Sequence, residues 1–162
     1  FTEVKNHDFI LRCFSQYLLV HPKSILCLVG DGPLKKEIQK QTKMLGIEKS
    51  TIFVGNVDNV NEFYSYFDCI LFPSLFEGLP FVLIEAQVSG LPIICSDRVT
   101  KDIKVTDIVS FLSLNDDIDK WIKEIDNKIN MIIDRQKYCE LFKGTKYDIK
   151  KLVTKMKQIY RS

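Results

Sequence analysis

The chain has 162 residues, of which 46% are hydrophobic and 27% are charged, and its formal net charge is +2. This length predicts one domain that can bury a core without disulfides or metals. The composition excludes a disordered chain. The near-neutral charge argues against nucleic acid or an anionic membrane as the main partner.

Terminal residues and cysteines indicate the context of the chain. It begins FTEVK, without an initiator Met or an apolar leader, so we expect the end of a longer protein. No apolar run approaches the roughly 20 residues of a membrane span. The five cysteines are odd in number and widely spaced, which predicts reduced thiols in the cytoplasm rather than disulfides or a metal site.

Apolar spacing and glycine or proline breaks define the expected elements. In chain order these are a helix at 9–18, a strand at 25–29, a helix at 33–45, a strand at 51–54, a helix at 59–66, a strand at 68–72, a helix at 80–89, strands at 92–96 and 109–112, and a helical remainder at 116–160 with one break near 143–144. This alternation predicts an α/β fold, a doubly wound parallel sheet with helices on both faces.

Glycine-containing segments follow three of the predicted strands. They occupy residues 30–33, 55–56 and 74–80. Because ligands of such sheets bind beyond the carboxyl ends of the strands, we expect these segments to share one site.

The third segment leads into the helix expected at 80–89. Backbone amides and the helix dipole at this N-terminus favour an anion, and phosphate is the usual one. Glu77 precedes the helix, and Glu85 lies one to two turns inside it, where we expect partial burial and donors such as sugar hydroxyls. The residues alone leave two plainer roles open, with Glu77 bonded to the helix amides and Glu85 as a solvated charge.

A family resemblance follows from residues 77–86, EGLPFVLIEA, in which Glu77 and Glu85 form an E-x7-E pair. Together with the sequences KNH at 5–7, VGDGP at 29–33, FVG at 53–55, PS at 73–74 and GLP at 90–92, this stretch resembles the retaining glycosyltransferases of the GT-B fold, family 4 type. The resemblance covers about residues 5–98.

The resemblance implies a C-terminal, Rossmann-like domain, here residues 1–162, that binds a nucleotide sugar. The implied catalytic residues are Glu77, which faces the donor sugar, and Lys5, which pairs with the diphosphate. Glu85 is implied to hold the ribose hydroxyls. The implied donor-binding residues are Gly30, Gly32, Gly55, Asn56, Val57, Asn59, Gly78, Leu79, Phe81, Val82 and Glu85.

The implied reaction moves a hexosyl group from a nucleoside-diphosphate sugar, expected to be a UDP-sugar, to a polysaccharide or lipid-linked acceptor with retention. No metal cofactor is expected, and we assign residues 115–117, Asn-Asp-Asp, to capping of a helix instead. His7, at a helix entry, is assigned a capping or surface role.

Two parts of the family pattern lie outside this sequence, an Arg before Lys5 and the acceptor-binding N-terminal domain. We therefore expect weak donor binding and little turnover by this chain alone. We expect a cytoplasmic bacterial protein, with any membrane contact made by the other domain at the inner face.

Three other functions are considered. A nucleotide-sugar epimerase of the same fold would share the donor cleft but need no acceptor. A non-catalytic nucleotide-binding module would not require both Glu77 and Glu85. A dinucleotide-dependent oxidoreductase is least favoured, because Leu34 and Lys35 stand where a third glycine is needed.

Overall fold

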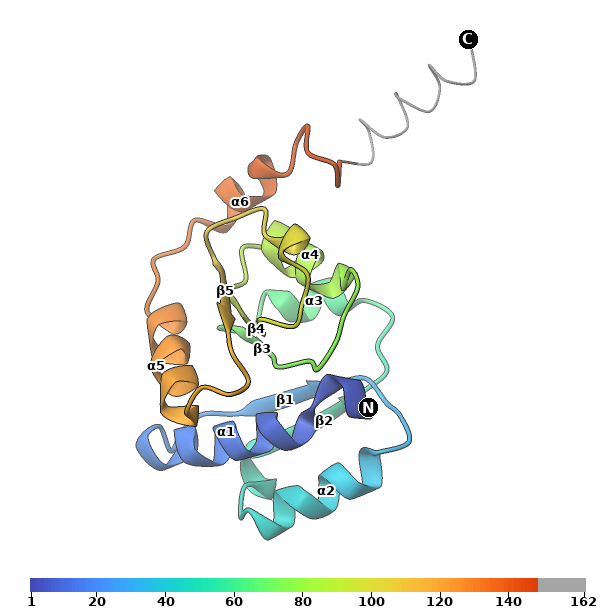
Figure 1. The fold of residues 1–162 in the computed structure, drawn as a ribbon, viewed down its shortest axis with the longest axis vertical. Coiled ribbons are helices and arrows are strands. Elements are labelled where there is room, and N and C mark those ends of the chain that lie inside the picture. Colours follow the sequence, from blue (N-terminus) through green and yellow to red (C-terminus); the bar gives the residue numbers. More distant parts are fainter. Residues whose placement is uncertain (149–162) are drawn as a thin grey trace.

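Figure 1 shows the computed structural model, which describes residues 1–148. Its elements alternate between helix and strand almost as the sequence predicts. In chain order they are η1 (Glu3–Lys5), α1 (His7–Val20), β1 (Leu26–Val29), α2 (Lys35–Met44), η2 (Glu48–Ser50), β2 (Thr51–Gly55), α3 (Val60–Tyr64), β3 (Ile70–Phe72), α4 (Phe81–Val88), β4 (Ile93–Ser96), η3 (Lys101–Ile103), β5 (Val109–Leu112), α5 (Ile118–Ile129) and α6 (Arg135–Leu141).

The five strands form two parallel sheets within the described residues. One contains β1 and β2, and the other has the order β3-β4-β5. The predicted α/β fold with parallel pairing is confirmed. The expected single sheet is divided because β1 and β3 are joined by side chains rather than by a hydrogen-bonded ladder. Leu28 of β1 and Leu71 of β3 pack in the same hydrophobic cluster.

Strand β4 separates two hydrophobic cores. Its side chains alternate between the faces of the sheet, so Ile94 packs with Trp121 of α5 in one core, whereas Ile93 and Cys95 pack with Leu83 of α4 in the other. Figure 1 shows α5 on one side of this sheet and α3 and α4 on the other. The doubly wound arrangement is thereby confirmed.

The chain after β5 differs from the prediction. An additional break separates α5 from α6, because the Asp134 side chain accepts from the backbone N–H groups of Gln136 and Lys137 and starts a new helix. Arg135 then donates to the backbone oxygens of Tyr64 and Phe67, which ties α6 to the rest of the domain. The part of the predicted helix beyond residue 148 lies outside the described residues.

The sequence predicted that residues 115–117 cap a helix and that the cysteines are reduced thiols. Asp117 stands at the N-cap of α5 but makes no side-chain capping bond, and Asp116 instead accepts from the Ser113 amide and the Lys120 ammonium. All five cysteines, which lie within residues 1–148, are free thiols.

Among residues 1–148, no helix combines the length and apolar character that crossing a membrane requires.

A buried amide fixes the segment between β4 and β5. The fully buried Gln87 of α4 donates to the backbone oxygens of Leu83 and Ile103, and its Oε1 accepts from the Val105 and Thr106 amides and from the Thr106 hydroxyl. Buried polar groups lose free energy when their partners are removed, so Gln87 holds this crossing segment on α4.

We expect Gln87→Leu to lower the free energy of unfolding by about 3 kcal/mol or more, because it leaves several buried donors and acceptors unpaired. Urea titration measures this loss. The matched control is Gln16→Leu at an exposed position of α1, for which we expect a change within about 0.5 kcal/mol. Equal, small changes in both variants would contradict the assigned role of Gln87.

Candidate functional site

Two pairs of strand ends carry the predicted site segments. Beyond β1 and β2, the Gly30 amide donates to the Gly55 oxygen at 2.7 Å, and both glycines have positive φ, 113° and 81°. Beyond β3 and β4, Glu77 lies beside Val99 in an isolated parallel bridge. The three predicted segments thus follow β1, β2 and β3 at their carboxyl ends, with β1 and β2 in one sheet and β3 in the other. That they share one site stays a prediction.

The first six residues connect these two pairs of strand ends. Phe1 accepts from the Leu34 amide at 3.3 Å, and its ring meets that of Phe53 edge-on at 6.2 Å. A Cβ on Gly32 would collide with the Phe1 backbone. Gly32 is thus required here by the close approach of Phe1, and a direct role toward the donor stays a prediction. Further along, the Leu75 amide donates to the Val4 oxygen at 2.8 Å.

Lys5 and Glu77, the two predicted catalytic residues, contact one another. The Lys5 Nζ donates to Glu77 Oε1 at 2.5 Å and lies 4.8 Å from the centre of the Phe72 ring. The Lys5 side chain is 41% exposed and that of Glu77 is 18% exposed. An ion pair this exposed adds little stability, so its main effect is to place opposite charges together at the end of β3.

Glu85 is brought out to solvent by the geometry of α4. Leu83, Ile84 and Ala86 turn into the core, which leaves the intervening Glu85 exposed, so the expected partial burial is wrong. Its Oε2 accepts a hydrogen bond of 3.0 Å from the hydroxyl of Tyr64 on α3. Burial, and then the neighbouring Glu85 carboxylate, raise the pKa of Tyr64, so this hydroxyl remains a donor at neutral pH.

The N-terminus of α4 lies next to Glu77 in the sequence. Pro80 is its N-cap and makes no side-chain capping bond. Glu77 directs Oε1 to Lys5, which favours its role as a charged partner over the alternative of a helix cap. The predicted phosphate-contacting residues surround this end, with Gly78, Leu79 and Phe81 exposed and Val82 half-buried.

The predicted base-binding loop runs from β2 to α3. Asn56 and Asn59 are exposed and Val57 is half-buried. Asn59 is the N-cap of α3, and its amide donates to Glu62 at 3.2 Å. The structure thus gives Asn59 a local partner, and its contact with a base stays a prediction.

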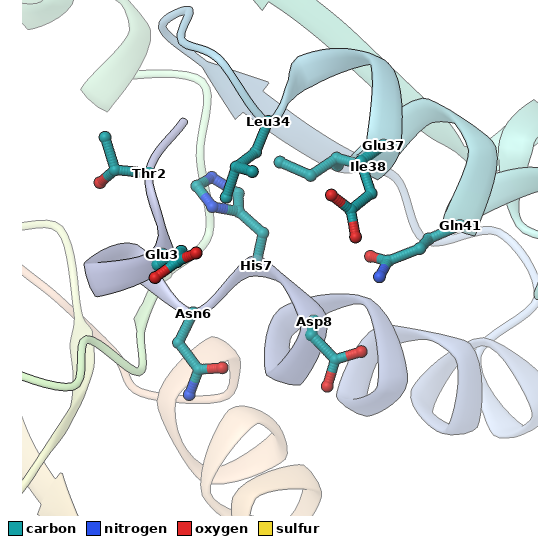
Figure 2. Close-up of a pocket in the computed structure, with 9 residues that line it drawn as sticks. All are labelled: Thr2, Glu3, Asn6, His7, Asp8, Leu34, Glu37, Ile38 and Gln41. Carbon is teal, nitrogen blue, oxygen red and sulfur yellow. The ribbon is translucent and has the colours of Figure 1, made fainter.

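A pocket of about 190 Å³ lies apart from Glu77 and Glu85, between the start of α1 and helix α2. Figure 2 shows its lining residues, Thr2, Glu3, Asn6, His7, Asp8, Leu34, Glu37, Ile38 and Gln41. His7 is half-buried in this pocket, and its Nδ1 has no hydrogen-bond partner among the described residues. Of the capping or surface role expected for His7, the capping part is wrong, because the preceding Asn6 occupies the N-cap of α1.

Within residues 1–148, no three His, Cys, Asp or Glu side chains gather as metal ligands would. The two carboxylates have protein partners, Lys5 for Glu77 and Tyr64 for Glu85.

Three residues of this region were missed at the sequence level. Tyr64 holds Glu85, Asn6 donates to the Pro73 oxygen at 3.1 Å, and the Ser96 hydroxyl donates to the Ser74 oxygen. An Asn before a helix is a recognisable capping signal, but no sequence pattern shows which loop its side chain reaches.

The fold is an α/β domain in which the predicted site segments follow parallel strands at their carboxyl ends. The chain belongs to the glycosyl transferases group 1, whose family model matches residues 1–138. The glycosyltransferase family inferred from the motifs is thereby confirmed, whereas retention of configuration stays a prediction.

Individual relatives agree with this assignment. EpsF of Bacillus subtilis is 39% identical over 126 residues, which are 77% of this chain and 33% of that protein. The UDP-Gal:alpha-D-GlcNAc-diphosphoundecaprenol alpha-1,3-galactosyltransferase of Escherichia coli is 30% identical over 146 residues, 86% of this chain and 37% of that protein. The chain thus spans about a third of the length of these curated relatives.

Solved structures share the fold at low identity. TarM of S. aureus, in a complex that contains UDP, superposes with a TM-score of 0.81 at 19% identity, covering 98% of this chain and 33% of TarM. The pneumococcal O-GlcNAc transferase GtfA, in complex with UDP and GlcNAc, gives a TM-score of 0.77 at 18% identity, covering 98% of this chain and 33% of GtfA. Both comparisons confirm the fold expected for a GT-B glycosyltransferase domain.

His7 is expected to make the free energy of unfolding of the domain depend on pH. Burial, and then the positive charges of the N-terminus and Lys5, lower the pKa of His7 from 6.5 to about 4. Between these values the unfolded chain binds the proton more readily, so the free energy of unfolding falls as the pH falls. Wild type should lose about 2 kcal/mol more than His7→Gln between about pH 7 and pH 5 in urea titrations. Equal losses would contradict the burial of a neutral His7.

Proposed function

We propose that this chain is the donor-binding domain of a retaining glycosyltransferase, which transfers a hexosyl group from a nucleoside-diphosphate sugar to an acceptor hydroxyl. The observation that carries this proposal is the contact between Lys5 and Glu77 beside the N-terminus of α4, the helix that also bears Glu85. The segment 77–85 thus contains two carboxylates and the free amides at the start of α4, and the Lys5 ammonium contacts the first carboxylate. A nucleotide sugar offers diphosphate and hydroxyl groups for each of them.

The diphosphate is proposed to lie at the N-terminus of α4. Helix amides and the helix dipole favour an anion there, and the exposed Gly78 leaves its backbone accessible. Leu79, Phe81 and Val82 contribute backbone contacts. Lys5 then stabilises the negative charge that develops on the leaving diphosphate, which is why we propose transfer without a metal cofactor.

The ribose is proposed to bind Glu85. Tyr64 occupies Oε2, and a carboxylate has a second oxygen that can accept from ribose hydroxyls. The residues that follow Gly55, Asn56, Val57 and Asn59, are proposed to line the base, with Gly30 and Gly32 allowing the neighbouring backbone to approach the donor. We propose uracil as the base, supported by the UDP named for TarM and GtfA and by the UDP-Gal named for the Escherichia coli relative.

The acceptor is proposed to be a growing polysaccharide or a lipid-linked sugar. Support comes from the diphosphoundecaprenol acceptor in the name of the Escherichia coli relative and from WaaG, a structural neighbour described as a glycosyltransferase of lipopolysaccharide biosynthesis. We propose that a second, N-terminal domain binds this acceptor at the inner face of the membrane, since the chain spans only about a third of the relatives.

Calorimetric titration of the chain with UDP, GDP, ADP and NAD, with and without magnesium, tests the donor site. We expect UDP alone to bind, equally well without magnesium. Glu85→Gln should weaken UDP binding about tenfold, because a neutral amide accepts weaker hydrogen bonds than a carboxylate. The matched control is Glu140→Gln at an exposed position of α6, which should change nothing. Binding of NAD instead of UDP, or full affinity in Glu85→Gln, would overturn this assignment.

Glu77→Ala is expected to separate binding from transfer. UDP affinity of the chain should stay within about threefold, because Lys5 and the helix amides remain. In the complete transferase that we propose, turnover should fall at least about 100-fold, since a group at the reacting centre is lost. Turnover is measured as product sugar formed from a radiolabelled donor. Unchanged turnover would remove Glu77 from the site, and free sugar epimerised without an acceptor would favour an epimerase.

A further inference from the structure

Residues 4–6 lie against the loop that carries Glu77. The Val4 oxygen accepts from the Leu75 amide at 2.8 Å, and the Asn6 Nδ2 donates to the Pro73 oxygen at 3.1 Å. Lys5 stands between these two contacts and reaches Glu77. The loop is thus bonded to the backbone before Lys5 and to the side chain after it.

The Lys5 side chain cannot fix its own direction toward Glu77. Its ammonium is a point charge at the end of a flexible four-carbon chain, and its pairing with Glu77 is too exposed to fix that chain firmly. The direction of Lys5 therefore depends on the backbone that bears it, which the flanking bonds to Pro73 and Leu75 hold in place.

Asn6 has the conformation that this arrangement requires. With φ 53° and ψ 50° it lies in the left-handed region, alone among the non-glycine residues that the structure describes. The backbone N–H of Asn6 donates to the Glu3 oxygen at 2.9 Å, and the backbone oxygen of Asn6 accepts from the Ile10 amide at 3.4 Å. The chain therefore turns at Asn6, from η1 into α1. Asn tolerates this conformation better than other residues with a side chain.

The side chain of Asn6 binds the Pro73 carbonyl, which lies just beyond the end of β3. Strand β3 ends at Phe72, and Pro73, which follows it, is buried. The next carbonyl, that of Ser74, accepts from Ser96 at the end of β4. The loop before Glu77 is consequently held by Asn6 through one carbonyl and by Ser96 through the next.

We propose that Asn6 is a positioning residue that holds Lys5 against Glu77. This inference rests on the proposed function for its consequence, because Lys5 would then meet the donor diphosphate already oriented. Its structural part concerns only residues 4–6 and 73–77 and is measurable without any ligand.

The test compares Asn6→Asp with Asn130→Asp. Asp keeps the shape and tolerates the left-handed conformation, but its carboxylate faces the Pro73 oxygen and repels it. Asn130 makes the same kind of bond, from its side-chain amide to the Asp126 oxygen at 2.8 Å, at the exposed end of α5. The control therefore changes the same groups away from the Glu77 loop.

The first readout is the ¹⁵Nζ signal of Lys5 in NMR spectra of the chain, assigned by its loss in Lys5→Arg. We expect this signal to shift or broaden in Asn6→Asp and to stay unchanged in Asn130→Asp. Asn6→Gly, which allows the left-handed conformation but lacks the amide, should also alter it, and this variant serves if Asn6→Asp fails to fold. A Lys5 signal that is the same in wild type and in the folded Asn6 variants would overturn the inference.

The second readout is affinity for UDP compared with uridine. Asn6→Asp should weaken UDP binding about tenfold, the loss expected when one charge-assisted contact is misaligned, and leave uridine binding unchanged. In a Lys5→Ala background the same substitution should have no further effect, since it acts through Lys5. Additive losses would contradict this route. Absence of UDP binding in wild type would overturn the proposed function, while the Lys5 signal would still decide the role of Asn6.

Discussion

The fully buried strand β4 is the constraint on which the rest of the domain depends. All four of its residues are buried, and their alternation supplies two cores, one covered by α5 and the other by α4. Because β3 and β5 both pair with β4 in parallel, their carboxyl ends are brought to one edge. The loop that bears Glu77 begins at this edge, so the geometry of the candidate site follows from the packing of a strand that carries none of the predicted donor-binding or catalytic residues.

The charged groups of the candidate site lie at the surface rather than in a cavity. Lys5 neutralises Glu77 at short range, and Tyr64 holds Glu85 on the outer face of α4. The pocket of about 190 Å³ lies elsewhere, between α1 and α2. An open site of this kind leaves the carboxylates accessible on one side, which agrees with the proposal that a second domain brings the acceptor to a bound donor.

The positions of the candidate residues in the fold were partly predictable because these residues stand in short motifs next to recognisable strands and helices. The E-x7-E pair, the glycines after the strands and Lys5 stand in short motifs, and strand pairing brings their loops to neighbouring strand ends. The contacts of Tyr64 with Glu85 and of Asn6 with Pro73 join residues 21 and 67 positions apart. No periodicity encodes such pairs. The prediction that Glu85 is partly buried was wrong for the same reason, because its burial depends on which face of α4 packs against the sheet.

The sequence by itself determined the order of helices and strands, the parallel class of the fold and the membership of the chain in its family. These properties are local, since apolar runs, turn residues and motif spacing act over a few residues. Only the tertiary structure decided that the strands divide into two sheets, that Glu85 is exposed, that His7 is half-buried and that Lys5 points at Glu77. Each of these depends on how distant segments pack, because the free energy of burial and of hydrogen bonding is set by neighbours that the chain meets only after it folds.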